Sequence, residues 1–220
     1  MACFVGFTRW AEHIMSCKRR LSKPWKRSIK LKVMNHCGKY LATPLHFAVH
    51  SSSSDTVEYL LENGADLNIK FRELTSPFYY AIKILDGSSR GYTTLESMLA
   101  HGADVKIVLR EAMRSRDDRL LELAIKYNAD LDLLIEQEWG GRTLTSLHQA
   151  VDAYMFDANR NTIGRLLEAG ADPLVKDSDG RTALQYLQEL CSFPFLVVQK
   201  QVEKKGEIES MFEEFGYSHA

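Results

Sequence analysis

The stretch Leu166-Leu167-Glu168-Ala169-Gly170-Ala171-Asp172 has three close counterparts in this chain of 220 residues. In each copy two apolar residues are followed by two variable residues, then by Gly or Asn, and then by Ala-Asp. Only Gly, and less readily Asn, tolerates the positive φ that ends a helix in a left-handed cap. The recurrence therefore predicts helices that end alike in a series of stacked repeats, which is a solenoid. The other copies are Leu60–Asp66, Met98–Asp104 and Ala124–Asp130.

A second phrase lies upstream of these helix ends, and its clearest form is Thr43-Pro44-Leu45-His46-Phe47-Ala48. Thr is a favoured N-cap, and Pro loses no hydrogen bond at the first helical position, so the phrase predicts a helix start. The helix before each left-handed cap carries a one-sided apolar stripe that one helix pair cannot bury alone, so neighbouring pairs must stack. The related phrases are Ser76–Ala81, Val108–Ala112, Thr145–Ala150 and Thr182–Leu187.

Together the two phrases resemble the Thr-Pro-Leu-His-x-Ala opening and the Leu-Leu-x-x-Gly-Ala-Asp close of the ankyrin-repeat family, from residue 36 to about residue 190. The resemblance implies an all-α fold, an α-solenoid of about five ankyrin-like helix-turn-helix repeats joined by irregular hairpin or loop fingers. We expect two regions in the chain. These are a basic N-terminal arm at residues 1–35 and an ankyrin-repeat domain at residues 36–220.

Unequal spacing predicts irregular connections. The interval from the small Ala of the first helix to the cap residue is longer in the second and fourth repeats than in the first and third. The extra residues are rich in turn formers and predict long loops within these helix pairs, at Asp86–Gly91 and Asp157–Asn161. The connection after Asp104 is too short for a hairpin finger, whereas the finger between Asp130 and Thr145 is enlarged.

The last segment of the chain is expected to be a helix that caps the stack. Ile208, Met211 and Phe212 supply its apolar side, and Lys204 belongs to the charged residues that would form its outer, polar side. A terminal repeat needs such a polar face because no further repeat covers it.

Charge is unevenly divided along the chain. Residues 1–54 hold ten Lys or Arg and one acidic residue, although the whole chain has a net charge of −1. The arm is open to three hypotheses: a solvated segment, a nuclear import signal, or a patch that binds an anionic membrane, with Trp10 and Trp25 at the interface. Nucleic acid is not expected, because the arm has few aromatic residues and the rest of the chain is acidic. The basic patch consists of Lys18, Arg19, Arg20, Lys23, Lys26, Arg27, Lys30 and Lys32.

Composition favours a cytoplasmic protein. The chain lacks the run of about 18 apolar residues that a membrane span needs, and its apolar start at Ala2–Phe7 is shorter than a signal-peptide core. Its four Cys residues show no disulfide-scaffold spacing, so reduced thiols are expected. The glutamate-rich C-terminal segment resembles the signals of effectors that intracellular bacteria export through type IV secretion. A host-targeting effector, acting in host cytoplasm or nucleus, is therefore a further hypothesis.

No catalytic constellation is recognisable in the sequence. His46 and His148 stand where ankyrin repeats use an imidazole to bridge backbone groups of adjacent repeats, so the resemblance implies a structural role for both. Four His and Cys residues near the N-terminus lack a Cys-x-x-Cys pair, and no nucleophile elbow or phosphate-binding Gly-rich loop appears. We therefore expect no catalysis, no cofactor, no metal and no small-molecule substrate. An effector enzyme with a site in the arm or in the 190–205 insertion is the alternative.

The resemblance implies a non-catalytic scaffold or adaptor that binds a partner protein along its concave surface, through first-helix surfaces and finger loops. Aromatic and Arg side chains dominate binding hot spots, so they lead the candidates. The alternative is an adaptor that its basic arm directs to an anionic membrane or to the nucleus. First-helix candidates are Phe47, Tyr80, Glu111, Gln149 and Tyr186, together with Tyr79, which replaces the motif His. Finger candidates are Phe71, Arg72, Glu73, Trp139, Arg142, Lys176 and Asp177.

Overall fold

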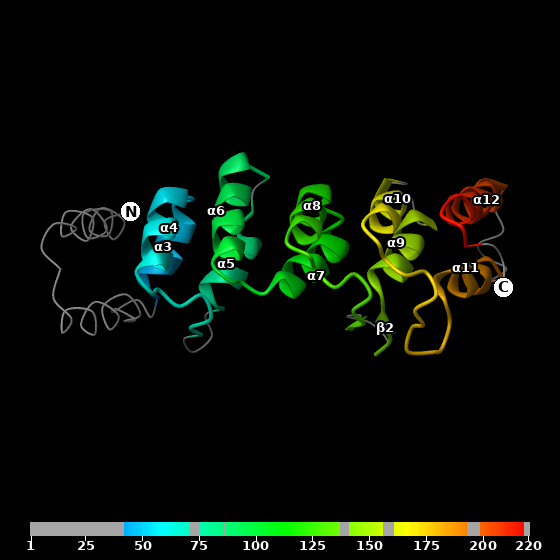
Figure 1. Ribbon diagram of the computed structural model, residues 1–220, viewed down its shortest axis with the longest axis horizontal. Helices are drawn as coiled ribbons and strands as arrows, with labels where there is room; N and C mark the ends of the chain where they lie inside the picture. The colour runs from blue at the N-terminus through cyan, green and yellow to red at the C-terminus, as the bar shows by residue number, and fades with distance from the viewer. Residues whose placement is uncertain are drawn as a thin grey trace, which may run out of the picture. The chain divides into compact units, whose positions relative to one another are not determined.

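The computed structural model describes most of the chain beyond residue 41, so the predicted basic arm lies outside the described residues (Figure 1). The chain divides between Asp104 and Val105 into two compact units, called unit 1 and unit 2 here, and each is described by itself. The described ranges are 42–70, 75–85, 87–136, 141–155, 161–192 and 199–217, with the side chains of residues 199–201 excepted.

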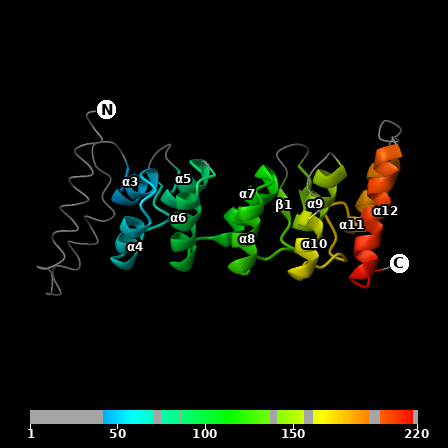
Figure 2. The ribbon, with the colours of Figure 1, turned by 90° about the horizontal axis from the view of Figure 1, so that it is seen from above.

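The described part of unit 1 contains two helix pairs. α3 (Pro44–His50) pairs with α4 (Ser54–Glu62), and α5 (Pro77–Lys83) pairs with α6 (Ser89–Ala100). The first helices α3 and α5 lie side by side in one layer, and the second helices α4 and α6 form the other layer (Figure 2). The residues that are buried in the core include Leu45, Val57, Phe78, Leu95 and Met98.

The described part of unit 2 contains three helix pairs and a short hairpin. α9 contacts both α7 and α11, so the first helices again form one layer. In the finger before α9, β1 (Ile135–Glu136) pairs antiparallel with β2 (Thr143–Leu144). The pairs are α7 (Val105–Ser115) with α8 (Asp118–Lys126), α9 (Ser146–Met155) with α10 (Asn161–Glu168), and α11 (Ala183–Ser192) with α12 (Gln199–Glu214). The predicted all-α solenoid of helix pairs is confirmed.

Helix starts follow the predicted capping chemistry. Pro44 and Pro77 occupy the first turns of α3 and α5, and the Ser76 side chain accepts a hydrogen bond from the Tyr79 N–H at 3.3 Å. Asp117 caps α8 by accepting from two backbone N–H groups of the first turn. These bonds satisfy helix N–H groups that have no partner within the helix. None of the described helices is long and apolar enough to cross a membrane.

The left-handed caps predicted from the recurring stretch are confirmed. The cap residues after α4, α6, α8 and α10 have φ of 86° at Gly64, 86° at Gly102, 55° at Asn128 and 91° at Gly170. After α10, the Gly170 N–H bonds the Leu167 carbonyl at 3.0 Å and the next N–H bonds the Leu166 carbonyl at 3.0 Å. The same pair of bonds closes the other three helices, so last-turn carbonyls are satisfied in the same way four times.

The long loop predicted in the second repeat is partly wrong, because α6 begins earlier than expected. Ser88 accepts a hydrogen bond from the Gly91 N–H at 3.4 Å and caps α6, so Ser89–Gly91 form a helical turn. A Cβ at position 91 would lie 2.8 Å from Leu85 Cδ2, and glycine allows this close approach. In the fourth repeat α9 extends to Met155, and residues 156–160 lie outside the described residues.

The predicted irregular fingers are confirmed. α6 ends at Ala100 and α7 begins at Val105, which leaves no room for a hairpin. The enlarged finger contains β1 and β2, and its tip at residues 137–140 lies outside the described residues. This finger is joined to the next one, because the Ser178 N–H bonds the Thr143 carbonyl at 3.1 Å and the Thr143 N–H bonds the Ser178 hydroxyl at 3.1 Å.

α12 packs on α9 and α11, and Ile208, Met211 and Phe212 on its expected apolar side are buried. That α12 caps the stack stays a prediction. Lys204 is not on the outer polar side, and that prediction is wrong. Its ammonium donates to the carbonyls of Tyr154 at 3.0 Å and Met155 at 3.4 Å, the last residues of α9. A buried cation at a helix C-terminus compensates carbonyls that would otherwise lack a donor.

Two glycines of one helix segment test the left-handed cap. A Cβ would meet nothing within 4 Å at Gly164, inside α10, or at Gly170, after it, so only backbone conformation separates them. We expect Gly170→Ala to lower the free energy of unfolding by about 1–2 kcal/mol, because an alanine is strained at positive φ. Gly164→Ala should raise it by up to about 1 kcal/mol, because alanine favours the helix. Urea unfolding measures both values, and equal effects would contradict the cap.

Candidate protein-binding surfaces

His46 ties α3 to the backbone that leads into α5. Its Nδ1 accepts hydrogen bonds from the Thr43 N–H at 3.1 Å and the Thr43 hydroxyl at 2.8 Å, and its Nε2 donates to the Thr75 carbonyl at 2.9 Å. A carbonyl can only accept, so Nε2 carries the proton of a neutral imidazole. Burial lowers the pKa of His46, and the bond to Thr75 opposes this only in part.

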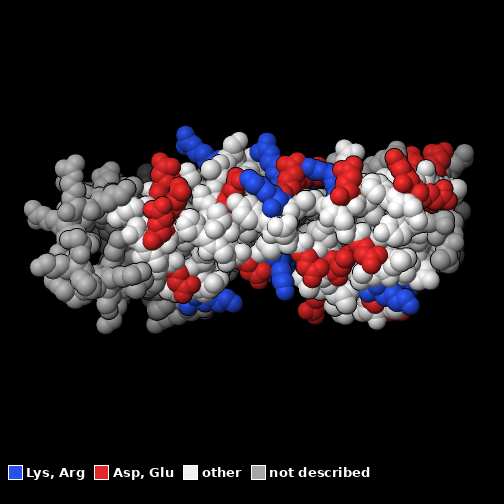
Figure 3. Space-filling view, viewed as in Figure 1, with Lys and Arg blue, Asp and Glu red and all other residues white. Residues whose placement is uncertain are grey.

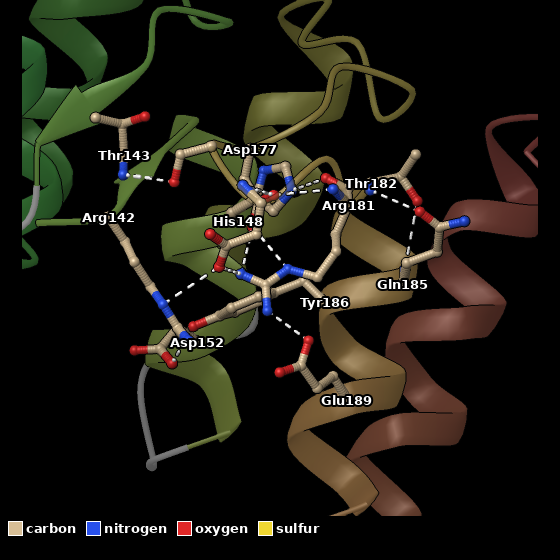
Figure 4. Close-up of polar contacts among 12 residues, drawn as sticks. Arg142, Thr143, His148, Asp152, Asp177, Arg181, Thr182, Gln185, Tyr186 and Glu189 are labelled. Atoms are coloured by element: carbon tan, nitrogen blue, oxygen red, sulfur yellow. Dashed lines mark hydrogen bonds and ion pairs between the residues drawn. The ribbon is translucent and has the colours of Figure 1, made fainter. Parts of the chain in front are cut away.

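His148 makes the same connection in unit 2. Its Nδ1 bonds the Thr145 hydroxyl at 2.7 Å, and its Nε2 donates to the Arg181 carbonyl at 3.0 Å, just before α11 (Figure 4). The side chain is fully buried, and burial lowers the pKa of His148. The structural role predicted for both histidines is therefore confirmed: each imidazole joins the start of one first helix to the start of the next.

In unit 1 the bridge supports a surface that we call the α3–α5 face, formed by Phe47, His50, Tyr79, Tyr80 and Lys83. The Tyr80 hydroxyl and His50 Nδ1 form a hydrogen bond of 2.7 Å, and the two rings stack with centroids 6.1 Å apart and planes 17° apart. The Lys83 ammonium lies 5.2 Å from the centre of the Tyr79 ring. His50 and Lys83 are exposed and the three aromatic side chains are half-buried. The face thus combines fixed aromatic rings with exposed nitrogen groups.

In unit 2 the corresponding α9–α11 face has a network of charged side chains centred on Arg181. The guanidinium donates to Asp177 at 2.7 and 3.0 Å and to Asp179 at 2.6 Å, and it also pairs with Glu189 (Figure 4). Burial alone would raise the pKa of Asp177, but the hydrogen bonds and charge of Arg181 lower it overall. Burial would lower the pKa of Arg181, and its bonds to Asp177 and Glu189 raise it instead. The ion pairs hold the finger against α11.

Tyr186 lies at the edge of this network, with its ring 5.1 Å from the Arg181 guanidinium. Its hydroxyl donates to Asp152 at 3.1 Å, across from α11 to α9 (Figure 4). Burial, and then the negative charge of Asp152, raises the pKa of Tyr186. The side chain is only 7% exposed, so it offers a partner much less surface than Tyr80.

The remaining candidates fall into two groups. Arg142 and Lys176 are exposed on the fingers, and Arg142 lies 3.3 Å from Asp179. Glu111 and Asp177 are buried and paired with arginines, and Gln149 is half-buried and donates to the Leu144 carbonyl. The candidates Phe71, Arg72, Glu73 and Trp139 lie outside the described residues, as do the arm residues Lys18, Arg19, Arg20, Lys23, Lys26, Arg27, Lys30 and Lys32.

Sequence reasoning missed residues that stand one helical turn after the first-helix candidates. His50 follows Phe47 by three positions, and Lys83 follows Tyr80 by three. Residues three apart share a helix surface, so this spacing could have found them. The same spacing gives Arg114, Asp152 and Glu189 in unit 2.

Comparison with known proteins agrees with this architecture. Residues 40–71 match the family model described as ankyrin repeat. Ankyrin repeat and SOCS box protein 5 of Homo sapiens is 55% identical over 40 residues, which are 18% of this chain and 12% of that protein. An ankyrin repeat protein of Fowlpox virus (strain NVSL) is 28% identical over 152 residues, 65% of this chain and 23% of that protein. The chain therefore spans less than a quarter of the length of these curated relatives.

A solved structure shows the same fold. The crystal structure of an ankyrin repeat domain from Acinetobacter baumannii AYE is 23% identical in sequence, with a TM-score of 0.59. The match covers 98% of this chain and 96% of that one.

The imidazole bridges predict a loss of stability in acid. Because burial lowers the pKa of His46 and His148 in the folded state, the unfolded chain binds protons more readily below about pH 6.5, the ordinary pKa of histidine. The free energy of unfolding should therefore fall as the pH drops below that value, with this contribution fully present above it. Urea unfolding across the pH range measures the slope.

Glutamine provides the matched variant, because Gln185 stands at the same motif position in the fifth repeat and accepts from the Thr182 N–H at 3.0 Å. The double variant His46→Gln, His148→Gln should show a smaller slope between about pH 7 and 5. The exposed His101→Gln serves as the control and should keep the wild-type slope. An unchanged slope in the double variant would mean that these two imidazoles do not carry the acid sensitivity.

Proposed function

Because this chain is built of ankyrin repeats, which are generally protein–protein interaction modules, we propose that it is a non-catalytic scaffold or adaptor for a partner protein. The partner binds the first-helix faces and the finger loops. Both kinds of surface are held by the hydrogen bonds of His46 and His148 and by the bonds between Thr143 and Ser178.

The α3–α5 face is the observation that carries this proposal. Tyr80 is half-buried, and its orientation is set by the hydrogen bond and ring stacking with His50. A tyrosine held in this way offers a large contact area and loses little conformational freedom when a partner binds. Such aromatic side chains carry a large share of the binding energy in protein interfaces.

Three titratable side chains with shifted pKa values have structural contacts. His46 and His148 bond backbone carbonyls, and the carboxylate of Asp177 is held by Arg181. Each of these groups is engaged in joining one repeat to the next or a finger to a helix. The proposal therefore assigns none of them to a reaction. Of the 190–205 insertion, residues 193–198 lie outside the described residues.

Affinity capture from a cell extract tests the scaffold. We expect the intact chain to retain specific proteins, and Tyr80→Ala to reduce their capture at least tenfold because it removes the fixed aromatic surface. The melting temperature should change by only a few degrees, since the side chain is half-buried. Tyr92→Ala is the control, because Tyr92 is also half-buried but lies on the second helix α6.

Two outcomes would contradict the proposal. Equal capture by Tyr80→Ala and Tyr92→Ala would remove the α3–α5 face from the binding surface. A large loss of stability in Tyr80→Ala would show that the side chain belongs to the core.

A second candidate function is an adaptor that the basic arm directs to an anionic membrane or to the nucleus, with the repeats holding cargo. The observation that favours it is the division of charge, with ten Lys or Arg and one acid in residues 1–54. Each basic residue near an anionic membrane adds about 1 kcal/mol to binding. The cytoplasmic location and the role as a host-targeting effector stay predictions.

Residues 1–35 fused to a fluorescent protein test this second function. Accumulation at the plasma membrane or in the nucleus is expected, and replacing Lys26 and Arg27 with Glu should abolish it because the charge is reversed. A diffuse signal from the unmodified fusion would exclude both targeting ideas.

A further inference from the structure

We propose that the α3–α5 face binds an acidic segment of the partner protein, in which a carboxylate meets Lys83 and a neighbouring apolar side chain packs on Phe47 and Tyr80. This inference rests on the proposed scaffold function and specifies the chemistry of its partner.

The charge of the face supports an acidic partner. Neither α3 nor α5 contains an Asp or Glu, and their exposed ionisable side chains include His50 and Lys83. In unit 1, acidic side chains gather instead over α4, in the other helix layer (Figure 3). A carboxylate that approaches Lys83 therefore meets no like charge on either of the two first helices.

Lys83 has the geometry of a receptor for such a carboxylate. Its ammonium lies 5.2 Å from the centre of the Tyr79 ring, and among the described residues no carboxylate oxygen lies within 4.0 Å of it. An ammonium above an aromatic ring keeps N–H donors that point away from the ring. Lys83 is thus positioned by Tyr79 and still able to bind an anion.

The aromatic part of the face explains why the partner segment must also be apolar. The Tyr80 hydroxyl already has a hydrogen-bond partner in His50, and the rest of this half-buried ring is carbon. Phe47 lies at the same motif position on α3, the neighbouring first helix. An apolar side chain beside a carboxylate would cover these rings while the carboxylate reaches Lys83.

Other anionic partners fit less well. A nucleic acid or an anionic membrane is bound through several cations at once, and α3 and α5 supply a single lysine. The chain's own basic arm carries the same sign of charge as Lys83 and offers no complement to it. A protein segment with a few carboxylates matches a face that has aromatic rings and a single lysine.

Unit 2 provides an internal contrast. The motif positions of His50 and Lys83 are occupied there by Asp152 on α9 and Glu189 on α11. These two positions of the α9–α11 face therefore carry carboxylates, which are held by Tyr186 and Arg181.

A random dodecapeptide library, displayed on phage and selected against the intact chain, is the probe for the inference. We expect the enriched peptides to carry a net negative charge and at least one large apolar residue. The selected peptides should bind at least tenfold more weakly to Lys83→Glu and to Tyr80→Ala than to the wild type. Their affinity for the wild type should fall as salt is added, because salt screens exposed charges.

Arg90→Glu is the matched control, because Arg90 is also an exposed cation of unit 1 but lies on the second helix α6. It should leave peptide binding within twofold of the wild type. Enriched peptides that are neutral or basic would overturn the inference, and so would a Lys83→Glu effect no larger than that of Arg90→Glu. In either case the scaffold function stands, because the chain still binds peptides. If no peptide is enriched and no protein is captured, both proposals fail.

Discussion

The buried imidazole that joins one first helix to the start of the next is the contact on which the arrangement of the first helices depends. In both copies one ring nitrogen closes a Thr cap, and the other reaches a carbonyl that lies 29 residues further on in unit 1 and 33 in unit 2. A buried donor or acceptor left without its partner costs about 1–3 kcal/mol, so ring, cap and carbonyl are kept at fixed separations. The exposed positions of neighbouring first helices are thereby held in register.

In the second and fifth repeats another residue stands where the imidazole would. Tyr79 stands at this position in the second repeat, and the chain then enters α7 without a hairpin finger. Gln185 stands there in the fifth repeat and satisfies its own cap, with its side-chain oxygen 3.0 Å from the Thr182 N–H.

The same scaffold presents two different chemical surfaces. Two positions of the first helix can vary between repeats: the one directly after the imidazole position and the one three residues later. Side chains there bond neither the helix cap nor the carbonyl of the next repeat. In unit 1 they include an aromatic ring and a cation, Tyr80 and Lys83, and in unit 2 they include a buried tyrosine and carboxylates. Repeat architecture fixes where these side chains stand, and their chemistry then decides which partner fits.

The sequence by itself determined the local features of this protein. A left-handed cap needs only Gly or Asn at one position, and a helix start needs only a capping side chain and Pro, so Gly170 and Pro77 could be assigned without knowing their neighbours. The small number of residues between Asp104 and the third repeat also predicted that a finger is missing there. The start of α6 was misplaced, because Ser88 caps the helix among residues that also favour turns.

Only the tertiary structure decided which polar side chains are surface and which are structural. Lys204 was expected in solvent but caps α9 from 50 residues away, and Asp177 and Tyr186 were expected to meet a partner but are buried among Arg181 and Asp152. Burial and pairing depend on groups that come from distant parts of the chain. Local periodicity predicts which elements form, whereas the environment of a charged or aromatic side chain is set by the elements packed against it.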